Sequence, residues 1–292
     1  MTELDKREEE VIFSQYLLEQ SYIDPTTEVE YPPVALSYGE SDYYASGGTI
    51  SHPTPIGTYG NFSFIQGPPK HKKTFLVTLL SAAYLGDCSS EYVDELRGHR
   101  DGKCLYHFDT EQGTYHAQKM FSRALQISGK DKACYMTYGL RSLSVEERLN
   151  VIEYCLSGDD NIGLVVIDGV ADLVNDVNNI EESNKVVQKL MTWSEKYNIH
   201  ILTVVHVNHN STKPTGHLGS AMEKKAETQI ALEKSELNEN IINVKCKSSR
   251  GRPFDSFSFM VNKHGLPFIV GADIEIFKKN NNVIENLLGN TR

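Results

Sequence analysis

The chain has 292 residues, 39% of them hydrophobic, which is enough for one large α/β domain with an appendage or for two domains. Its net charge of -10 and pI of about 5.5 exclude a broad electrostatic coating of nucleic acid, but they allow a local basic groove. The five cysteines include no C-x-x-C pair, and the sequence has neither a signal peptide nor a long apolar run. We therefore expect free thiols in a soluble, cytoplasmic protein with no membrane contact.

The first sixty residues differ in character from the rest of the chain. Apolar side chains recur at helical spacing within residues 1–20, at Val11, Ile12, Tyr16, Leu17 and Leu18. This spacing predicts an amphipathic helix. Residues 21–60 contain several prolines and the Gly47-Gly48 pair, so they predict a lead-in with little regular structure.

From residue 61 onward, apolar runs typical of strands alternate with helical patterns. The expected strands are 62–66, 104–108, 133–138, 163–167 and 199–206, and the expected helices are 73–85, 114–127, 144–156 and 182–197. Ser144 and Glu147 form a capping-box pattern at the start of the third helix. This alternation predicts an α/β fold with a mostly parallel sheet covered on both faces. The strand patterns at 228–232, 241–246 and 257–261 predict an antiparallel extension of that sheet.

The most informative motif lies between the first expected strand and the first expected helix. Gly67 and Lys73-Thr74 have the spacing of a phosphate-binding P-loop, G-x-x-x-x-G-K-[ST], with Lys72 where the second glycine usually lies. In such a loop, backbone N–H groups and the helix N-terminus surround the β-phosphate, the lysine reaches the β/γ oxygens, and the Thr74 hydroxyl binds Mg²⁺. The alternative is a basic turn before a core helix.

The backbone donors of this loop follow two prolines, which have no N–H to offer. The residues left to contact the phosphates are Lys70, His71, Lys72, Lys73, Thr74 and Phe75.

Three further strands end in polar side chains, at the edge where open α/β sheets bind ligands. Asp168 would hold Mg²⁺ together with Thr74. Glu111 is our choice for the base that orients the attacking water or accepts its proton, while Asp109 would cap the following helix. His206 is a candidate sensor of the γ-phosphate. The plainer alternatives are a turn aspartate, a helix cap and a structural histidine.

In this order, the motifs resemble those of RecA-like P-loop ATPases, especially the hexameric RepA/DnaB helicase branch and the RepA-like AAA-type proteins of bacterial plasmids and mobile elements. The resemblance covers about residues 45–270. It implies ATP and Mg²⁺ as cofactors, the segment 67–74 as the phosphate loop and Glu111 as the catalytic carboxylate. It also implies that Asp168 is the Mg²⁺-associated acid and His206 the sensor. We expect an N-terminal helix and lead-in over 1–45, a RecA-like ATPase domain over 46–275, and a tail over 276–292.

Two segments resemble parts that this family uses in its oligomers. Segment 215–221 resembles a loop-to-helix turn that faces the central channel through which single-stranded DNA passes. Segment 244–252 resembles a hairpin that inserts a cation into the neighbouring subunit's active site, with Lys247 and Arg250 as the candidates. The family usually separates these two cations by one residue, whereas here two residues separate them. The alternative is an exposed basic turn. The resemblance implies a homo-oligomer, such as a hexameric ring, with single-stranded DNA as a partner.

Three functions remain open from the sequence. The first is an ATP-hydrolysing motor or clamp in DNA replication, mobilisation or a related DNA transaction. The second is an ATP-binding regulatory or assembly module with weak hydrolysis, which the acidic pI and Lys72 favour. The third is a small-molecule kinase, which the lack of an evident Arg-rich lid weakens. Glu111, His206 and the cationic hairpin favour the first, because a pure binder needs no water-activating acid.

Overall fold

The computed structural model describes residues 3–45, 48–86, 92–207, 213–236 and 238–270. Contacts divide the chain into two compact units, Met1–Pro32 and Pro33–Arg292. The first unit contains α1 (Glu3–Ser21), which confirms the predicted N-terminal helix. Within the described ranges, no helix is long and apolar enough to cross a membrane. The predicted tail at 276–292 lies outside the described residues, and the boundaries at residues 45 and 275 stay predictions.

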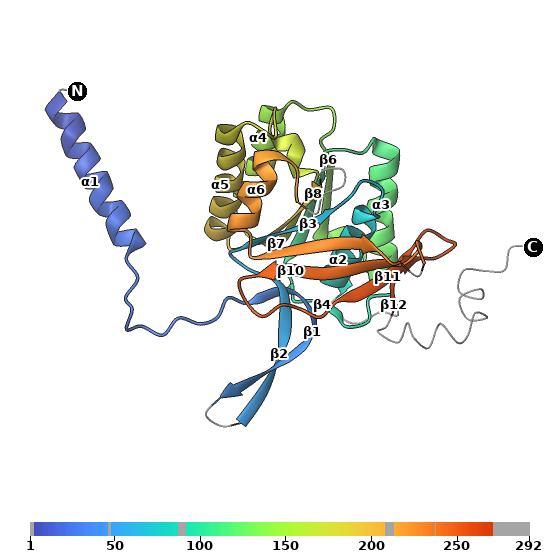
Figure 1. The fold of residues 1–292 in the computed structure, drawn as a ribbon. Helices are drawn as coiled ribbons and strands as arrows, with labels where there is room; N and C mark the ends of the chain where they lie inside the picture. The colour runs from blue at the N-terminus through green and yellow to red at the C-terminus, as the bar shows by residue number, and fades with distance from the viewer. Residues whose placement is uncertain (1–2, 46–47, 87–91, 208–212, 237, 271–292) are drawn as a thin grey trace, which may run out of the picture. The chain divides into compact units, whose positions relative to one another are not determined.

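A nine-stranded sheet runs through the second unit in the order β12-β11-β10-β9-β3-β8-β7-β5-β6 (Figure 1). The strands that pair in parallel are β3 (Phe62–Gly67), β5 (Cys104–Asp109), β6 (Tyr135–Gly139), β7 (Ile162–Asp168), β8 (His200–His206) and β9 (Thr228–Lys234). The antiparallel extension consists of β10 (Ile242–Ser249), β11 (Phe257–Val261) and β12 (Pro267–Val270). The predicted RecA-like α/β fold is therefore confirmed, with β12 as an additional strand.

Helices cover both faces of this sheet, as the alternating sequence pattern predicts. One hydrophobic cluster lies under α2 (Lys73–Gly86) and α3 (Thr114–Ser128). The other cluster lies under α4 (Val145–Gly158), α5 (Ile180–Lys196) and α6 (Gly216–Lys225). The Ser144–Glu147 capping box is present at the start of α4. The short 3-10 turn η1 (Lys132–Cys134) delays the start of β6 to Tyr135, and a second one, η2 (Val170–Leu173), follows β7.

The expectation of an irregular lead-in over residues 21–60 is wrong for the two stretches 34–45 and 48–58, which are strands. β1 (Val34–Ala45) and β2 (Gly48–Thr58) form an antiparallel hairpin, and β1 also pairs with β4 (Leu96–Gly98). Pro53 and Pro55 lie in β2, which is an edge strand of this three-stranded sheet. An edge strand tolerates proline because the missing N–H can face away from the ladder.

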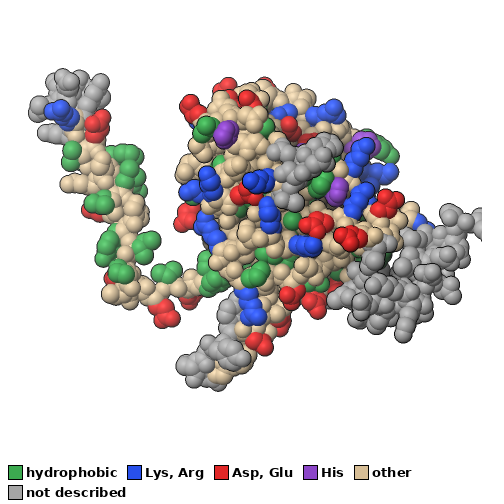
Figure 2. All heavy atoms as spheres, viewed as in Figure 1, with side chains coloured by type: hydrophobic (Ala, Val, Ile, Leu, Met, Phe, Trp, Pro, Cys, Tyr) green, Lys and Arg blue, Asp and Glu red, His purple; other side chains and the backbone are tan. Residues whose placement is uncertain are grey.

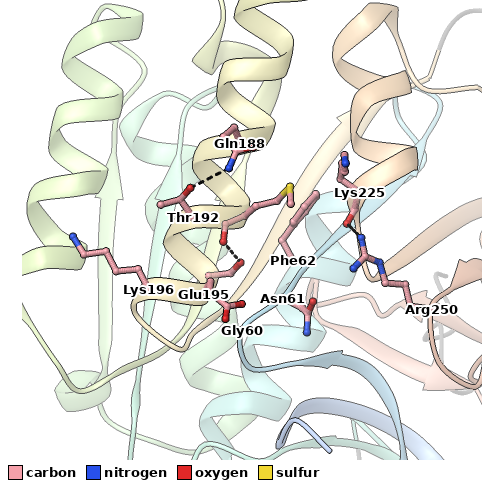
Figure 3. A pocket seen from close by; sticks show the side chains of 11 residues that line it. Gly60, Asn61, Phe62, Gln188, Thr192, Glu195, Lys196, Lys225 and Arg250 are labelled. Atoms are coloured by element: carbon pink, nitrogen blue, oxygen red, sulfur yellow. Dashed lines mark hydrogen bonds between the residues drawn. The ribbon is translucent and has the colours of Figure 1, made fainter. Parts of the chain in front are cut away.

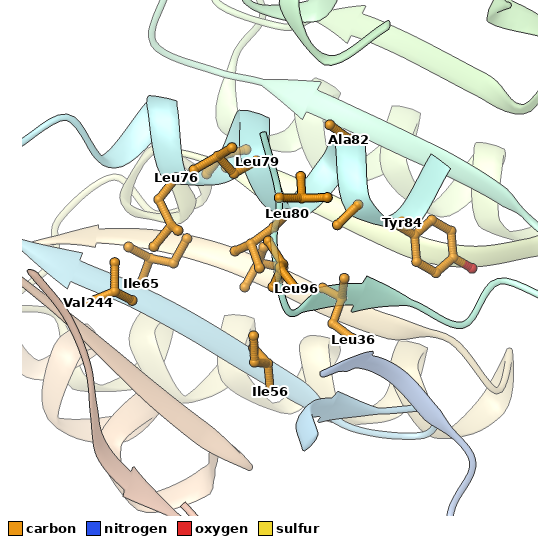
Figure 4. Close-up of a cluster of buried hydrophobic side chains, with 14 of the residues drawn as sticks. Leu36, Ile56, Ile65, Leu76, Leu79, Leu80, Ala82, Tyr84, Leu96 and Val244 are labelled. Carbon is orange, nitrogen blue, oxygen red and sulfur yellow. The ribbon is translucent and has the colours of Figure 1, made fainter. Parts of the chain in front are cut away.

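This hairpin is part of the hydrophobic core. Leu36 of β1, Ile56 of β2 and Leu96 of β4 are fully buried in the same cluster as Ile65 of β3 and the leucines of α2 (Figure 4). Burying a side chain of this size contributes about 1.5–3 kcal/mol. The hairpin base therefore stabilises the helix that follows the phosphate loop.

Candidate functional site

Three of the predicted site residues, together with Asp109, lie at the carboxyl ends of adjacent strands. Gly67 of β3 is in register with His206 of β8, and Asp109 of β5 is in register with Asp168 of β7. Since β8 and β7 are neighbours, the four strand ends share one edge of the sheet. This is the edge at which open α/β sheets bind their ligands.

The loop between β3 and α2 contains two left-handed residues and a glycine that lies close to β9. A Cβ on Gly67 would lie 3.2 Å from the Cβ of Leu232 and 3.4 Å from its carbonyl oxygen, so the close approach of β9 favours glycine there. Lys72 takes a left-handed conformation with φ of 58°, as does Lys70 with φ of 64°. Lys72 thus adopts a conformation that glycine reaches without a steric penalty.

Two of the expected loop donors are already used within the loop. The His71 N–H donates to the Pro68 carbonyl at 3.3 Å, and the Phe75 N–H donates to the Lys72 carbonyl at 3.0 Å. By contrast, α2 begins at Lys73, and the first N–H groups of a helix have no partner within it. The positive N-terminal end of α2 therefore lies at the carboxyl end of β3, next to Gly67.

The Lys73 side chain is buried against the start of the loop. Its Nζ donates to the carbonyl oxygens of Gly67 at 2.9 Å and Pro68 at 3.1 Å, and to Nδ1 of His206 at 3.1 Å. Burial lowers the pKa of Lys73, while the nearby Glu111 and Asp168 carboxylates oppose that shift. The ammonium therefore lies at the centre of the strand-end cluster.

His206 connects Lys73 to Glu111. Its Nε2 lies 2.9 Å from Oε1 of Glu111. Because the Lys73 ammonium can only donate, Nδ1 of His206 accepts, and Nε2–H donates to the Glu111 carboxylate. This bond lowers the pKa of Glu111, so the carboxylate stays ionised at neutral pH, and its side chain remains 42% exposed. The sequence identifies each of the three residues as a candidate, but it does not predict that they are hydrogen-bonded to one another.

Asp109 shapes the turn that presents Glu111. Its carboxylate accepts from the backbone N–H of Glu111 at 3.0 Å, and from the backbone and side chain of Gln112 at 2.7 and 2.6 Å. The N-cap of α3 is Gly113, which makes no side-chain capping bond. The expectation that Asp109 caps this helix is therefore wrong, because its carboxylate caps the preceding turn instead.

Asp168 has the features of a cation ligand. Its side chain is buried, and Oδ2 has no hydrogen-bond partner among the described residues. Burial raises the pKa of Asp168 to about 7, the Asp109 and Glu111 carboxylates add to the shift, and a hydrogen bond with Thr74 opposes it. An orphaned carboxylate oxygen beside a threonine hydroxyl is the kind of donor set that Mg²⁺ takes together with substrate phosphates. These residues therefore fit the ion.

Sequence reasoning missed Thr110, which holds the turn after Asp168. Its Oγ1 contacts the carbonyl oxygens of Asp168 and Gly169 and the Asp172 carboxylate, at 2.8–3.0 Å. A Cβ on Gly169, whose φ is 108°, would lie 2.2 Å from this hydroxyl. Thr110 directly follows β5 and Gly169 directly follows β7, the neighbour of β5 in the sheet, and this pairing is the signal that could have pointed to Thr110.

The raised pKa of Asp168 predicts a pH-dependent stability effect. Between the ordinary pKa of 3.8 and about 7 the folded state binds more protons than the unfolded state, so stability falls as pH rises through this window. Asparagine cannot ionise, so Asp168→Asn should be more stable than the wild type without Mg²⁺, with a difference that grows by roughly 1–3 kcal/mol between pH 5 and pH 8. Urea unfolding at both pH values checks this. A difference that is constant or shrinks would contradict the burial of an ionised carboxylate.

Lys247 and Arg250 lie at the other edge of the sheet. Ser249 of β10 pairs with Thr228, the first residue of β9, and β9 runs parallel to β3. Arg250 lines a cavity of about 440 Å³ together with Phe62, the first residue of β3, and donates to the Lys225 carbonyl at 2.7 Å (Figure 3). Lys247 pairs with Glu223 at 3.0 Å. One chain therefore does not bring these cations to its own Lys73.

The fold and the strand-end cluster together define a RecA-like P-loop protein. Residues 58–212 match the AAA domain family, and because this range covers more than half of the chain, the protein belongs to that family. The range includes the phosphate loop, Glu111, Asp168 and His206, and it ends before Lys247 and Arg250. Membership of this family indicates a nucleotide-binding ATPase. No curated protein matches the chain.

Proposed function

We propose that this protein is a Mg²⁺-dependent ATPase of the RepA/DnaB type, which works as an oligomeric ring on single-stranded DNA in replication or mobilisation. The observation that carries the proposal is the hydrogen-bonded series Lys73–His206–Glu111. It puts a phosphate-binding cation and a solvent-accessible carboxylate on either side of one polar side chain. A site that only bound nucleotide would need no such carboxylate.

Each residue of the site has a separate role in ATP hydrolysis. Lys73 binds the β/γ oxygens together with the backbone at the start of α2. Thr74 and Asp168 would hold Mg²⁺, which neutralises charge on the phosphates when bound. Glu111 orients the attacking water and accepts its proton, and its low pKa keeps it in the basic form. His206, which touches both Lys73 and Glu111, senses whether the lysine is engaged by phosphate.

A direct connection from His206 to α6 supports the coupling of hydrolysis to DNA. The carbonyl oxygen of His206 accepts from both the backbone N–H and the hydroxyl of Thr215, at 3.0 and 2.9 Å. Thr215 is the N-cap residue of α6, whose surface carries the exposed side chains of His217, Lys224 and Lys225. Figure 2 shows basic side chains interspersed with acidic ones on the face in view, so the negative net charge does not make that face uniformly acidic. A few cations on one helix suit a limited number of phosphate contacts.

Stimulation by DNA is the test of this proposal. We expect ATP turnover by the wild-type protein to rise several-fold when single-stranded DNA is added, and the effect to weaken with salt. The charge-neutralising pair Lys224→Gln and Lys225→Gln should reduce the stimulation and leave the basal rate unchanged. A basal rate that does not respond to DNA would favour the alternative, an ATP-dependent regulatory or assembly module. The left-handed backbone at Lys72 favours that alternative, because it strains the phosphate loop.

If the protein works as a ring, two inactive variants should restore activity when their subunits are mixed. If Arg250 of one subunit completes the site of the next, a mixture of Arg250→Ala and Lys73→Ala proteins should hydrolyse more ATP than either protein alone. The specific activity of the wild type should also rise with protein concentration, because an isolated subunit lacks the cation. The check is a turnover assay over a range of mixing ratios and concentrations. Turnover independent of concentration, with no rescue in the mixture, would make the hairpin an ordinary exposed turn.

A further inference from the structure

Two cysteines lie together at the ends of β5 and β6 that are far from the nucleotide site. Leu105 is in register with Tyr135, which places Cys104 beside Cys134 at the start of these parallel strands. The two thiols are free and are in hydrogen-bonding contact. Both side chains belong to the same hydrophobic cluster, so they project from the same face of the sheet. No step of the proposed hydrolysis uses them.

The general spacing of neighbouring strands is compatible with a disulfide at this position. Neighbouring strands lie about 4.8 Å apart, and disulfides join Cα atoms separated by roughly 4.4–6.8 Å. Cys134 also ends the 3-10 turn η1 rather than lying inside a ladder, so its backbone can adjust without breaking β6. We propose that Cys104 and Cys134 form a reversible intramolecular disulfide when the protein meets a low-molecular-weight disulfide such as oxidised glutathione.

The difference in exposure between the two thiols determines which of them reacts first with the oxidant. Cys134 is partly exposed, whereas Cys104 is only 6% exposed, and burial raises the pKa of the Cys104 thiol to about 11. The Cys134 thiolate therefore attacks first, breaks the S–S bond of the oxidant and forms a mixed disulfide with release of one thiol. Cys104 then loses its proton and attacks the sulfur of Cys134, which releases the second thiol. Two electrons pass from the cysteine pair to the oxidant, and the two protons finish on the released thiols.

The Cys104–Cys134 disulfide would link an edge strand of the sheet covalently to its neighbour. β6 is the last strand of the nine-stranded sheet, and β5 is its neighbour there. A covalent link between the first residue of β5 and the residue before β6 closes the chain segment that contains α3, which removes conformational freedom from the unfolded state. We expect oxidation to raise Tm by roughly 5–10 °C.

Peptide mapping tests the proposal directly. The native full-length protein is treated with oxidised glutathione, its remaining thiols are alkylated, and the tryptic peptides are measured by mass spectrometry without reduction. Trypsin places Cys104 in peptide 104–119 and Cys134 in peptide 133–141, each with a single cysteine. We expect these two peptides to be linked, and dithiothreitol to separate them. The same link should form in Cys155→Ser, a matched control on α4.

Two results would overturn the proposal. One is a native protein in which 104–119 and 133–141 stay unlinked, or link no more often than in protein oxidised in urea. The other is a Tm that rises equally on oxidation in the wild type and in Cys134→Ser, because that rise could not come from this bond. Cys134 is only partly buried, so its replacement by serine should leave the fold intact.

Discussion

Lys73→Ala should bind ATP at least about tenfold more weakly than the wild type and lose most of its turnover, because a charge-assisted bond to phosphate contributes roughly 1.5–3 kcal/mol. Its ammonium is the one loop cation that is buried at the strand ends, where it contacts Gly67, Pro68 and His206. No other side chain of the loop could take its place without moving the backbone. Calorimetric titration with Mg²⁺-ATP measures the loss.

Lys72→Ala is the matched control for this variant. The Lys72 ammonium reaches the carbonyl oxygen of Asn240 at 3.3 Å rather than the strand-end cluster. Alanine would keep the left-handed backbone strain at φ of 58° and remove only this contact, so ATP affinity should change little. If Lys72→Ala were the more damaging of the two, the assignment of the phosphate-binding lysine would be wrong.

Glu111→Gln should bind ATP normally and turn it over at least about tenfold more slowly. The glutamine oxygen can still accept the hydrogen bond from Nε2 of His206, so the Lys73–His206 contact and the loop are preserved. What is lost is the ability to take a proton from water. Single-turnover hydrolysis with saturating ATP separates this chemical effect from binding.

Asp109→Asn serves as the control for this second variant. Asp109 accepts hydrogen bonds from the turn that carries Glu111, and an asparagine oxygen can accept most of them. We therefore expect a smaller loss of turnover than in Glu111→Gln. Normal turnover in Glu111→Gln, or a larger loss in Asp109→Asn, would remove Glu111 from the role of base.

The sequence predicts the positions of these side chains only where the signal is local. The P-loop spacing and the acids at or just after the ends of β5 and β7 follow from short motifs, and parallel strands must bring their carboxyl ends to one edge. The contacts of His206 with Lys73 and Glu111 join residues far apart in the chain, so no local pattern encodes them. The strain at Lys72 likewise becomes visible only in the backbone.

The sequence does not predict the β1–β2 hairpin, for a different reason. Pro53 and Pro55 are ordinarily turn signals, and only their place on an edge strand makes them compatible with a ladder. The same limit applies to Arg250, whose basic hairpin is evident in the sequence. That its guanidinium lies at the sheet edge opposite Lys73 depends on the direction of β10, which only the fold determines.

Phosphate release from ATP by the purified protein, compared with Glu111→Gln prepared in the same way, tests most directly whether this site hydrolyses ATP. We expect a wild-type rate that requires Mg²⁺, disappears with a chelator and falls at least about tenfold in the variant, while both proteins bind ATP equally well. A wild-type rate no higher than that of Glu111→Gln, or failure of the wild type to bind Mg²⁺-ATP, would show that this site is not the proposed ATPase centre.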